Sequence, residues 1–89
     1  SGLDRFAEDL SPNNSGLMEG IITDRSELVG KKISEIHFTE ALDTVPITIC
    51  ADGVCHFNDL SDHVFRTGDA VLMFGTWKVF YWLKTKSTF

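Results

Sequence analysis

An Asp-Gly pair at residues 52–53 lies between two short apolar segments, and it constrains the fold of this chain more than any other feature. Residues 45–51 precede the pair and residues 54–58 follow it. An Asp-Gly pair in this setting is the strongest short-range indication of a β-hairpin with a two-residue loop. Pro46 has no backbone N–H, so its end of the first strand should lie at an edge or a bulge.

The two-residue loop also predicts which residues face each other, because residues equidistant from the turn are paired. Cys50 is then opposite Cys55, and Ile49 is opposite His56. A metal site that adds His56 or His63 to the thiols conflicts with this register, since His56 points to the other face from Cys55. Two unpaired cysteines packed as small apolar residues are the simplest interpretation. A redox pair is the alternative, and a cross-strand disulfide would need an oxidising environment.

The segments around the hairpin predict the other elements. Residues 17–23 should form a strand, and residues 28–36 should form a short amphipathic helix. Residues 70–74 are apolar without alternation, which predicts a strand covered on both faces. Thr76 should cap a last helix over residues 77–84. We therefore assign the chain to the α+β class, with the order β-α-β-β-β-α, a small mixed sheet and two to three helices.

The first part of the chain has a different character. Its apolar residues recur at helical spacing before Pro12 and a turn-rich segment; they are Leu3, Phe6, Ala7 and Leu10. We expect residues 1–16 to be the end of an upstream helix and a linker, and residues 17–89 to be the domain itself. The opening residues also indicate a piece of a larger protein.

The predicted last helix carries more apolar side chains than a single core-facing stripe needs. A chain of 89 residues buries only about 60–65% of its unfolded surface and is marginally stable alone. The surplus apolar surface should therefore meet a second copy, another domain or a ligand. The residues concerned are Trp77, Val79, Phe80, Tyr81, Trp82 and Leu83.

Charge and composition argue against several classes of protein. The net charge is −5, and the basic residues are scattered, which argues against nucleic acid as the main partner. No run approaches the roughly 18 apolar residues that span a bilayer, and no signal peptide opens the chain. Direct membrane insertion is therefore not expected. Two cysteines are too few for a disulfide framework, which favours a cytoplasmic protein with reduced thiols.

Catalytic and cofactor-binding patterns are also missing. No spacing brings a nucleophile, a base and an orienting group together, so we assign no catalytic residue and no metal ligand. Gly30-Lys31-Lys32 lacks the earlier glycine and the Ser/Thr of a phosphate-binding loop, and no G-x-G-x-x-G occurs. We expect no enzyme and no cofactor within this fragment. A small thiol or metal-dependent enzyme, resting on Cys50 and Cys55 alone, is the least favoured hypothesis.

Four motifs occur in an order that resembles a known family. They are Glu19-Gly20, then residues 25–36 (RSELVGKKISEI), the Asp-Gly pair at 52–53, and residues 65–75 (FRTGDAVLMFG). Over residues 17–84 the chain is similar to the RCK-C or TrkA-C domain, the C-terminal regulatory domain of K+ channel and transport proteins. The resemblance implies a homodimer that follows a nucleotide-binding domain or a membrane cation channel or transporter.

The resemblance also implies a ligand site between protomers. Some family members bind cyclic di-AMP there, partly through a third strand that often contains proline; this chain has His-Phe-Asn-Asp at residues 56–59 instead. The implied ligand-binding residues are Ile47, His56, Phe57 and Asn58, with Arg25 as a cation for a phosphate.

These observations together predict a ligand-sensing, dimerising regulatory domain of a potassium or other cation channel or transporter. The effector would be a nucleotide, such as a cyclic dinucleotide, or an ion. The expected location is the cytoplasm, as part of a membrane-associated transport system. The alternative is a dimerisation and scaffolding domain of a transporter that binds no ligand.

Overall fold

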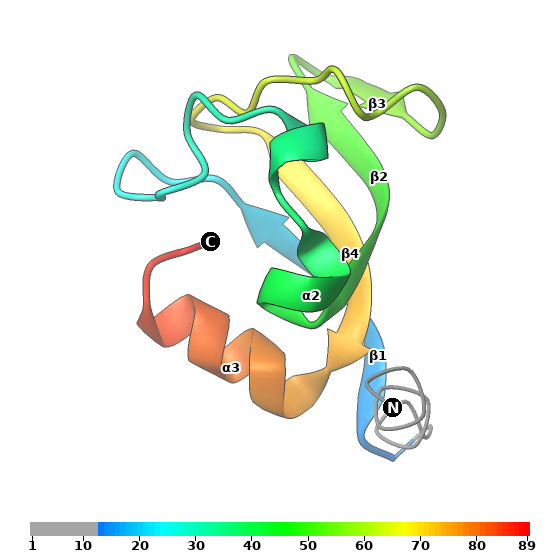
Figure 1. Ribbon diagram of the computed structural model, residues 1–89, viewed down its shortest axis with the longest axis vertical. Coiled ribbons are helices and arrows are strands. Elements are labelled where there is room, and N and C mark those ends of the chain that lie inside the picture. The colour runs from blue at the N-terminus through cyan, green and yellow to red at the C-terminus, as the bar shows by residue number, and fades with distance from the viewer. Residues whose placement is uncertain (1–12) are drawn as a thin grey trace.

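The computed structural model describes residues 13–89, which form one four-stranded sheet with the helices on one of its faces (Figure 1). The predicted α+β class and element order are confirmed, and every strand pair is antiparallel rather than mixed. The helix predicted around residues 3–10 lies outside the described residues. The elements are β1 (Ser15–Ile21), the 3-10 helix η1 (Ile33–Glu35), α2 (Phe38–Leu42), β2 (Thr44–Ala51), β3 (Val54–His56), β4 (Ala70–Thr76) and α3 (Trp77–Thr85).

The last strand in sequence, β4, lies inside the sheet, whose order is β1-β4-β2-β3. Val71 and Met73 of β4 point to the helical side and are fully buried. Leu72 and Phe74 point to the other side and are only half-buried. Within residues 13–89, therefore, the prediction that this strand is covered on both faces is not met, since no described element covers one face of the sheet.

That uncovered face is lined by apolar side chains from three strands, and we call it the open face. In one row across the sheet, Leu17 pairs with Phe74, which pairs with Val45. Further rows run through Leu72 and through Ile21, Ala70 and Cys50. Leu17 is 55% exposed and Ile21 is 45% exposed. The residues that define the open face are Leu17, Ile21, Val45, Leu72 and Phe74.

The helix predicted over residues 28–36 is absent, and a set of turns followed by η1 takes its place. Gly30 has a φ of +83°, which lies in the left-handed region and cannot continue a helix. Its N–H donates to the Phe65 carbonyl, and the Phe65 N–H donates to the Lys31 carbonyl. Long-range backbone hydrogen bonds thus replace helical ones here.

A short helix, α2, forms instead at residues that we had placed after the end of the predicted helix. Phe38 and Leu42 are four residues apart and both are buried against the sheet. Asp43 ends the helix with a φ of 55°. The i, i+4 spacing of these two apolar residues is the sequence feature that indicates α2.

The hairpin prediction is confirmed in its turn and its register. Asp52 and Gly53 have φ values of 52° and 78°, as a type I′ turn requires. Cys50 pairs with Cys55 and Ile49 pairs with His56. The pairing of β2 with β4 shifts between residues 46 and 48, so the bulge expected near Pro46 is also present.

The predicted last helix is confirmed as α3, with Thr76 as its N-cap. The Thr76 hydroxyl accepts a hydrogen bond from the Val79 N–H at 3.2 Å. Phe80 and Leu83 of α3 enter the core. The buried apolar core between the sheet and the covering elements consists of Ile22, Leu28, Ile33, Phe38, Leu42, Ile49, Phe65, Val71, Met73, Phe80 and Leu83.

Candidate functional site

The β2–β3 hairpin carries four of the five predicted ligand-binding residues. Ile47 lies on β2 at the bulge and is 40% exposed. His56 ends β3, and Phe57 and Asn58 follow it directly. All three are exposed, and 67% of the Phe57 surface is accessible. The hairpin thus presents an aromatic ring, an imidazole and a carboxamide to solvent from one short segment.

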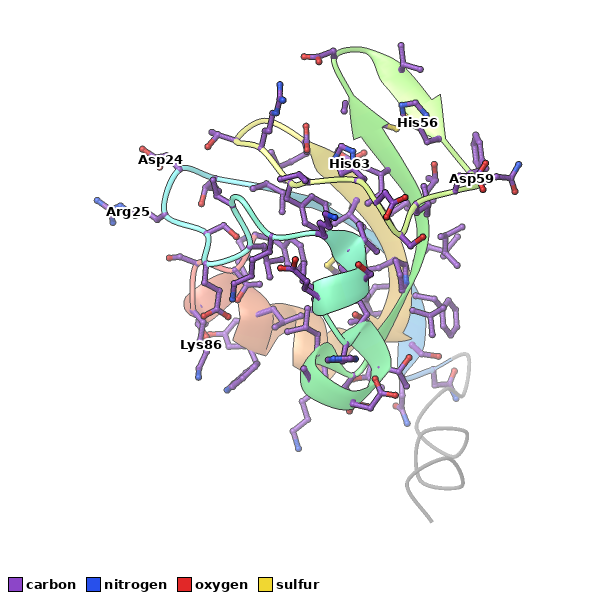
Figure 2. All side chains as sticks on the ribbon, turned by 45° about the horizontal axis from the view of Figure 1, so that its top comes forward. Asp24, Arg25, His56, Asp59, His63 and Lys86 are labelled. Atoms are coloured by element: carbon purple, nitrogen blue, oxygen red, sulfur yellow. A yellow bond between two sulfur atoms is a disulfide. The ribbon has the colours of Figure 1, made fainter. Side chains whose placement is uncertain are left out.

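Arg25 is not brought together with these residues in the single chain. It lies in the turn after β1 and is exposed. Figure 2 shows Arg25 and Asp24 on the opposite side of the molecule from His56 and Asp59. The single chain therefore does not bring the Arg25 side chain to the hairpin.

The hairpin is fastened to the sheet mainly through β2. Ile49 of β2 is fully buried in the core, whereas every residue of β3 is exposed. One side-chain bond supports β3, from the Thr48 hydroxyl to the His56 carbonyl at 2.5 Å. Since β3 is a short edge strand, it buries no side chain that would hold it in place.

A disulfide joins Cys50 to Cys55 across the hairpin. The interpretation of two unpaired cysteines packed as small apolar residues is therefore wrong, as is the expectation of reduced thiols. Cys50 is half-buried, and Cys55 is exposed. The register that we derived from the turn is what places the two sulfur atoms side by side. The bond also removes both thiols from the hypothetical metal site and from the hypothetical thiol enzyme.

His63, the other histidine considered as a metal ligand, has a structural partner. Its Nε2 lies 2.8 Å from the Asp69 Oδ2, and the same oxygen accepts a hydrogen bond from the Arg66 N–H at 2.9 Å. The Gly68 N–H donates a hydrogen bond to the Ile22 carbonyl, and the Ile22 N–H donates one to the Asp69 carbonyl. Gly68, with a φ of +94°, allows this turn. The Gly-Asp motif therefore joins the end of β1 to the start of β4.

A hollow lies along α3, away from the hairpin. It has a volume of about 830 Å³, and Trp77, Tyr81 and Trp82 line it. These three side chains are 43%, 73% and 49% exposed, so the predicted surplus of apolar surface on the last helix is confirmed. Lys86 lies 4.2 Å from the Trp82 ring centre. None of the predicted ligand-binding residues lines this hollow.

None of the helices within residues 13–89 is long and apolar enough to cross a bilayer.

Comparison with known proteins places these features in a family of folds. No protein-family model matches the chain, and no curated protein matches it. Solved structures do match. The RCK_C domain dimer of S. agalactiae BusR in complex with c-di-AMP is similar over 80% of this chain and 93% of that chain, with 24% identity and a TM-score of 0.69.

A second match is the RCK C domain of the potassium transport protein KtrA, in complex with cyclic diadenosine monophosphate. It covers 94% of this chain and 93% of that chain, with 14% identity and a TM-score of 0.70. The RCK domain of GsuK matches with a TM-score of 0.63 and 14% identity. This chain spans 18% of the length of the GsuK chain.

A longer form of S. agalactiae BusR, in complex with its busAB-promotor DNA, also matches, with 21% identity and a TM-score of 0.69. This chain spans 45% of that BusR chain. This fold thus also occurs within a chain solved in complex with DNA, so the comparison does not support the expectation that nucleic acid is not a partner. By its strands, its helices and these structural neighbours, the chain has the fold of RCK_C domains.

Proposed function

We propose that this chain is a dimerising, ligand-sensing regulatory domain of a potassium or other cation channel or transporter, and that a cyclic dinucleotide binds it between two protomers. The observation that carries the proposal is the shared fold with two domains solved in complex with cyclic di-AMP, those of BusR and KtrA. Each match covers 93% of the BusR or KtrA domain with which this chain was compared. A cytoplasmic location, beside a membrane transport system, belongs to the same proposal.

The open face is the surface by which we propose that two copies associate. It carries apolar side chains on three strands, with Glu19 and Thr48 in the row of Leu72, and no described element of the chain covers it. Exposed apolar side chains gathered on one face of a small domain, with polar groups among them, are typical of an interaction site. Leu17 and Ile21 at its edge are both close to half exposed. A second copy would remove them from water and supply the stability that a chain of this length lacks.

The hairpin is the part of the domain that we propose binds the ligand. Cys50 lies in the same row of the sheet as Ile21 and Ala70, so the hairpin borders the open face. Phe57 offers a flat exposed ring on which an adenine base can stack, and such stacking contributes about 1–3 kcal/mol per base. His56 and Asn58 supply hydrogen-bonding groups beside it.

We propose that Arg25 contacts the ligand held by the hairpin of the other protomer. Within one chain it lies on the opposite side of the molecule from His56 (Figure 2). In a symmetric dimer, however, the guanidinium of one copy can approach a phosphate held by the hairpin of the other.

Sedimentation equilibrium, with and without cyclic di-AMP, tests dimerisation. We expect a dimer, and we expect Leu17→Glu to be a monomer, because a dimer would bury its charge without a partner. Leu17 is exposed in the single chain, so this substitution should leave the monomer folded. Tyr81→Glu is the matched control, since Tyr81 is 73% exposed on α3. A dimer lost in Tyr81→Glu and kept in Leu17→Glu would overturn the choice of the open face.

Isothermal titration calorimetry with cyclic di-AMP tests the ligand site. We expect Phe57→Ala to weaken binding about tenfold or more, as the loss of one stacked base implies. Val54→Ala is the control, because Val54 is an exposed residue of the same hairpin. A stable dimer that gives no heat with cyclic di-AMP, other nucleotides or cations would favour the scaffolding alternative.

A second candidate concerns what the domain regulates. The match to BusR in complex with its promotor DNA supports a ligand sensor within a DNA-binding regulator rather than within a transporter. Binding of the full parent protein to genomic DNA fragments, with and without cyclic di-AMP, separates the two. Ligand-dependent DNA binding would favour the regulator, and ligand-dependent cation flux in vesicles would favour the transporter.

A further inference from the structure

We propose that the Cys50–Cys55 bond is a thiol–disulfide exchange site, at which a dithiol reductant releases β3 and thereby weakens the binding of the ligand. The ligand part of this inference rests on the proposed function. The release of β3 does not, because it concerns the hairpin alone.

In the single chain the bond is accessible to an attacking thiol. Cys55 is exposed, Cys50 is half-buried, and the hairpin that holds them forms the edge of the sheet. Accessibility is a main determinant of exchange rates, together with the fraction of the attacking thiol present as thiolate. A buried structural disulfide in the core of the domain would not offer this approach.

The exchange itself is a two-electron reaction with a dithiol. A thiolate of the reductant attacks the Cys55 sulfur, forms a mixed disulfide with it and releases Cys50 as a thiolate, which takes up a proton. The second thiol of the reductant, as a thiolate, then attacks the reductant sulfur that is bonded to Cys55. This step closes a disulfide within the reductant and releases Cys55 as a thiolate. The domain gains two thiols, and the reductant becomes a disulfide.

Little else holds β3 in place once the bond is open. The strand has three residues, all exposed, and it pairs with β2 alone. Apart from the disulfide, the bond from the Thr48 hydroxyl to the His56 carbonyl is the one side-chain hydrogen bond to β3 within residues 13–89. In contrast, Ile49 and Val71 anchor β2 and β4 in the core and do not depend on the disulfide. Reduction should therefore release β3 locally and leave the rest of the sheet intact.

The release of β3 also frees the residues that we propose bind the ligand. His56, Phe57 and Asn58 follow Cys55 in the chain without an intervening anchor. When the bond is open, the hairpin must become ordered before it can bind the ligand. The entropy lost in this ordering makes the binding free energy less favourable. Linkage then requires the converse effect: a bound ligand protects the disulfide from reduction by the same factor.

Hydrogen exchange followed by mass spectrometry tests the release of β3 in the ligand-free protein. We expect peptides over residues 54–60 to exchange about tenfold faster or more after reduction, because the hairpin opens locally. Peptides over β1 and β4 should be unchanged. The variant C50S/C55S should match the reduced protein and should not respond to the reductant, which shows that the reductant acts through this bond. Equal exchange over residues 54–60 in both forms, or faster exchange throughout the sheet, would overturn the inference.

Calorimetry with cyclic di-AMP on the oxidised and reduced protein tests the coupling. We expect binding to be at least about fivefold weaker after reduction, within the usual range of allosteric coupling. Equal affinity of both forms would overturn the coupling. If the oxidised protein does not bind cyclic di-AMP at all, the proposed ligand is wrong, whereas the exchange experiment still decides whether the bond controls β3.

Discussion

The Ser26 hydroxyl donates a hydrogen bond of 2.6 Å to the carbonyl of Thr88, which lies 62 residues further along the chain. Both residues are buried. The same hydroxyl oxygen accepts the Leu28 N–H at 3.1 Å. One side chain therefore fixes the turn after β1 and holds the end of the described chain against it. This gives a physical role to the serine of the motif at residues 25–36.

Ser26→Ala should lower the free energy of unfolding by about 1–3 kcal/mol, because it leaves a buried carbonyl and a buried N–H without this partner. Urea denaturation followed by tryptophan fluorescence measures the change. Ser34→Ala is the control, since Ser34 is exposed. An equal midpoint for both variants would show that the Ser26 bond contributes nothing.

Asp69→Ala should also destabilise the fold, by about 2–3 kcal/mol. The buried carboxylate accepts the Arg66 N–H and contacts His63, and hydrogen bonds to charged groups contribute more than neutral ones. Thermal unfolding by circular dichroism measures the effect. Asp62→Ala, at an exposed position four residues before Arg66, should unfold like the unchanged protein. A loss of similar size in both variants would contradict a specific role for Asp69.

Two glycines of β1 should respond differently to alanine. A Cβ at Gly20 would lie 2.6 Å from the Phe89 ring and 2.7 Å from the Met73 Cε, and Met73 is fully buried. A Cβ at Gly16 would meet the far edge of the Trp77 ring, which is 43% exposed and can turn toward solvent.

We therefore expect Gly20→Ala to cost about 1–3 kcal/mol, as overpacking of a core does, and Gly16→Ala to cost less. Urea denaturation of the two variants side by side measures the difference. The reverse order would show that the Phe89 ring moves away more easily than the Trp77 ring.

The variant C50S/C55S should lose no more than about 2 kcal/mol of global stability. The disulfide closes a loop of only a few residues, and the entropy that a cross-link removes from the unfolded chain grows with loop length. Guanidinium denaturation under oxidising conditions measures the loss. A much larger loss would mean that the bond supports the core, which contradicts the local role that we infer.

The parts of the fold set by local chemistry could be predicted. The Asp52-Gly53 turn determined its own register, because few residue pairs accept two positive φ values. Thr76 capped α3 as expected. The helix over residues 28–36 could not be predicted correctly, since its amphipathic spacing competes with hydrogen bonds to Phe65, more than thirty residues later. Such long-range pairing leaves no trace in a short sequence window.

The candidate site was only partly accessible from sequence. The register placed Cys50 beside Cys55, yet the bond was set aside because two cysteines suggested a reducing compartment. Ile47, His56, Phe57 and Asn58 were grouped correctly on one hairpin. The position of Arg25 across the molecule follows from the path of the loop after β1, which depends on tertiary contacts. Its role stays a prediction.

The position of β4 between β1 and β2 has a consequence for how this chain folds. The strand that completes the sheet is the last to be synthesised, and its partner β1 precedes it by about fifty residues of sequence. During synthesis the β2–β3 hairpin can form from nearby residues, but the core must wait for residue 76 to leave the ribosome. A nascent domain of this topology is therefore dependent on its final segment, and high contact order of this kind slows folding.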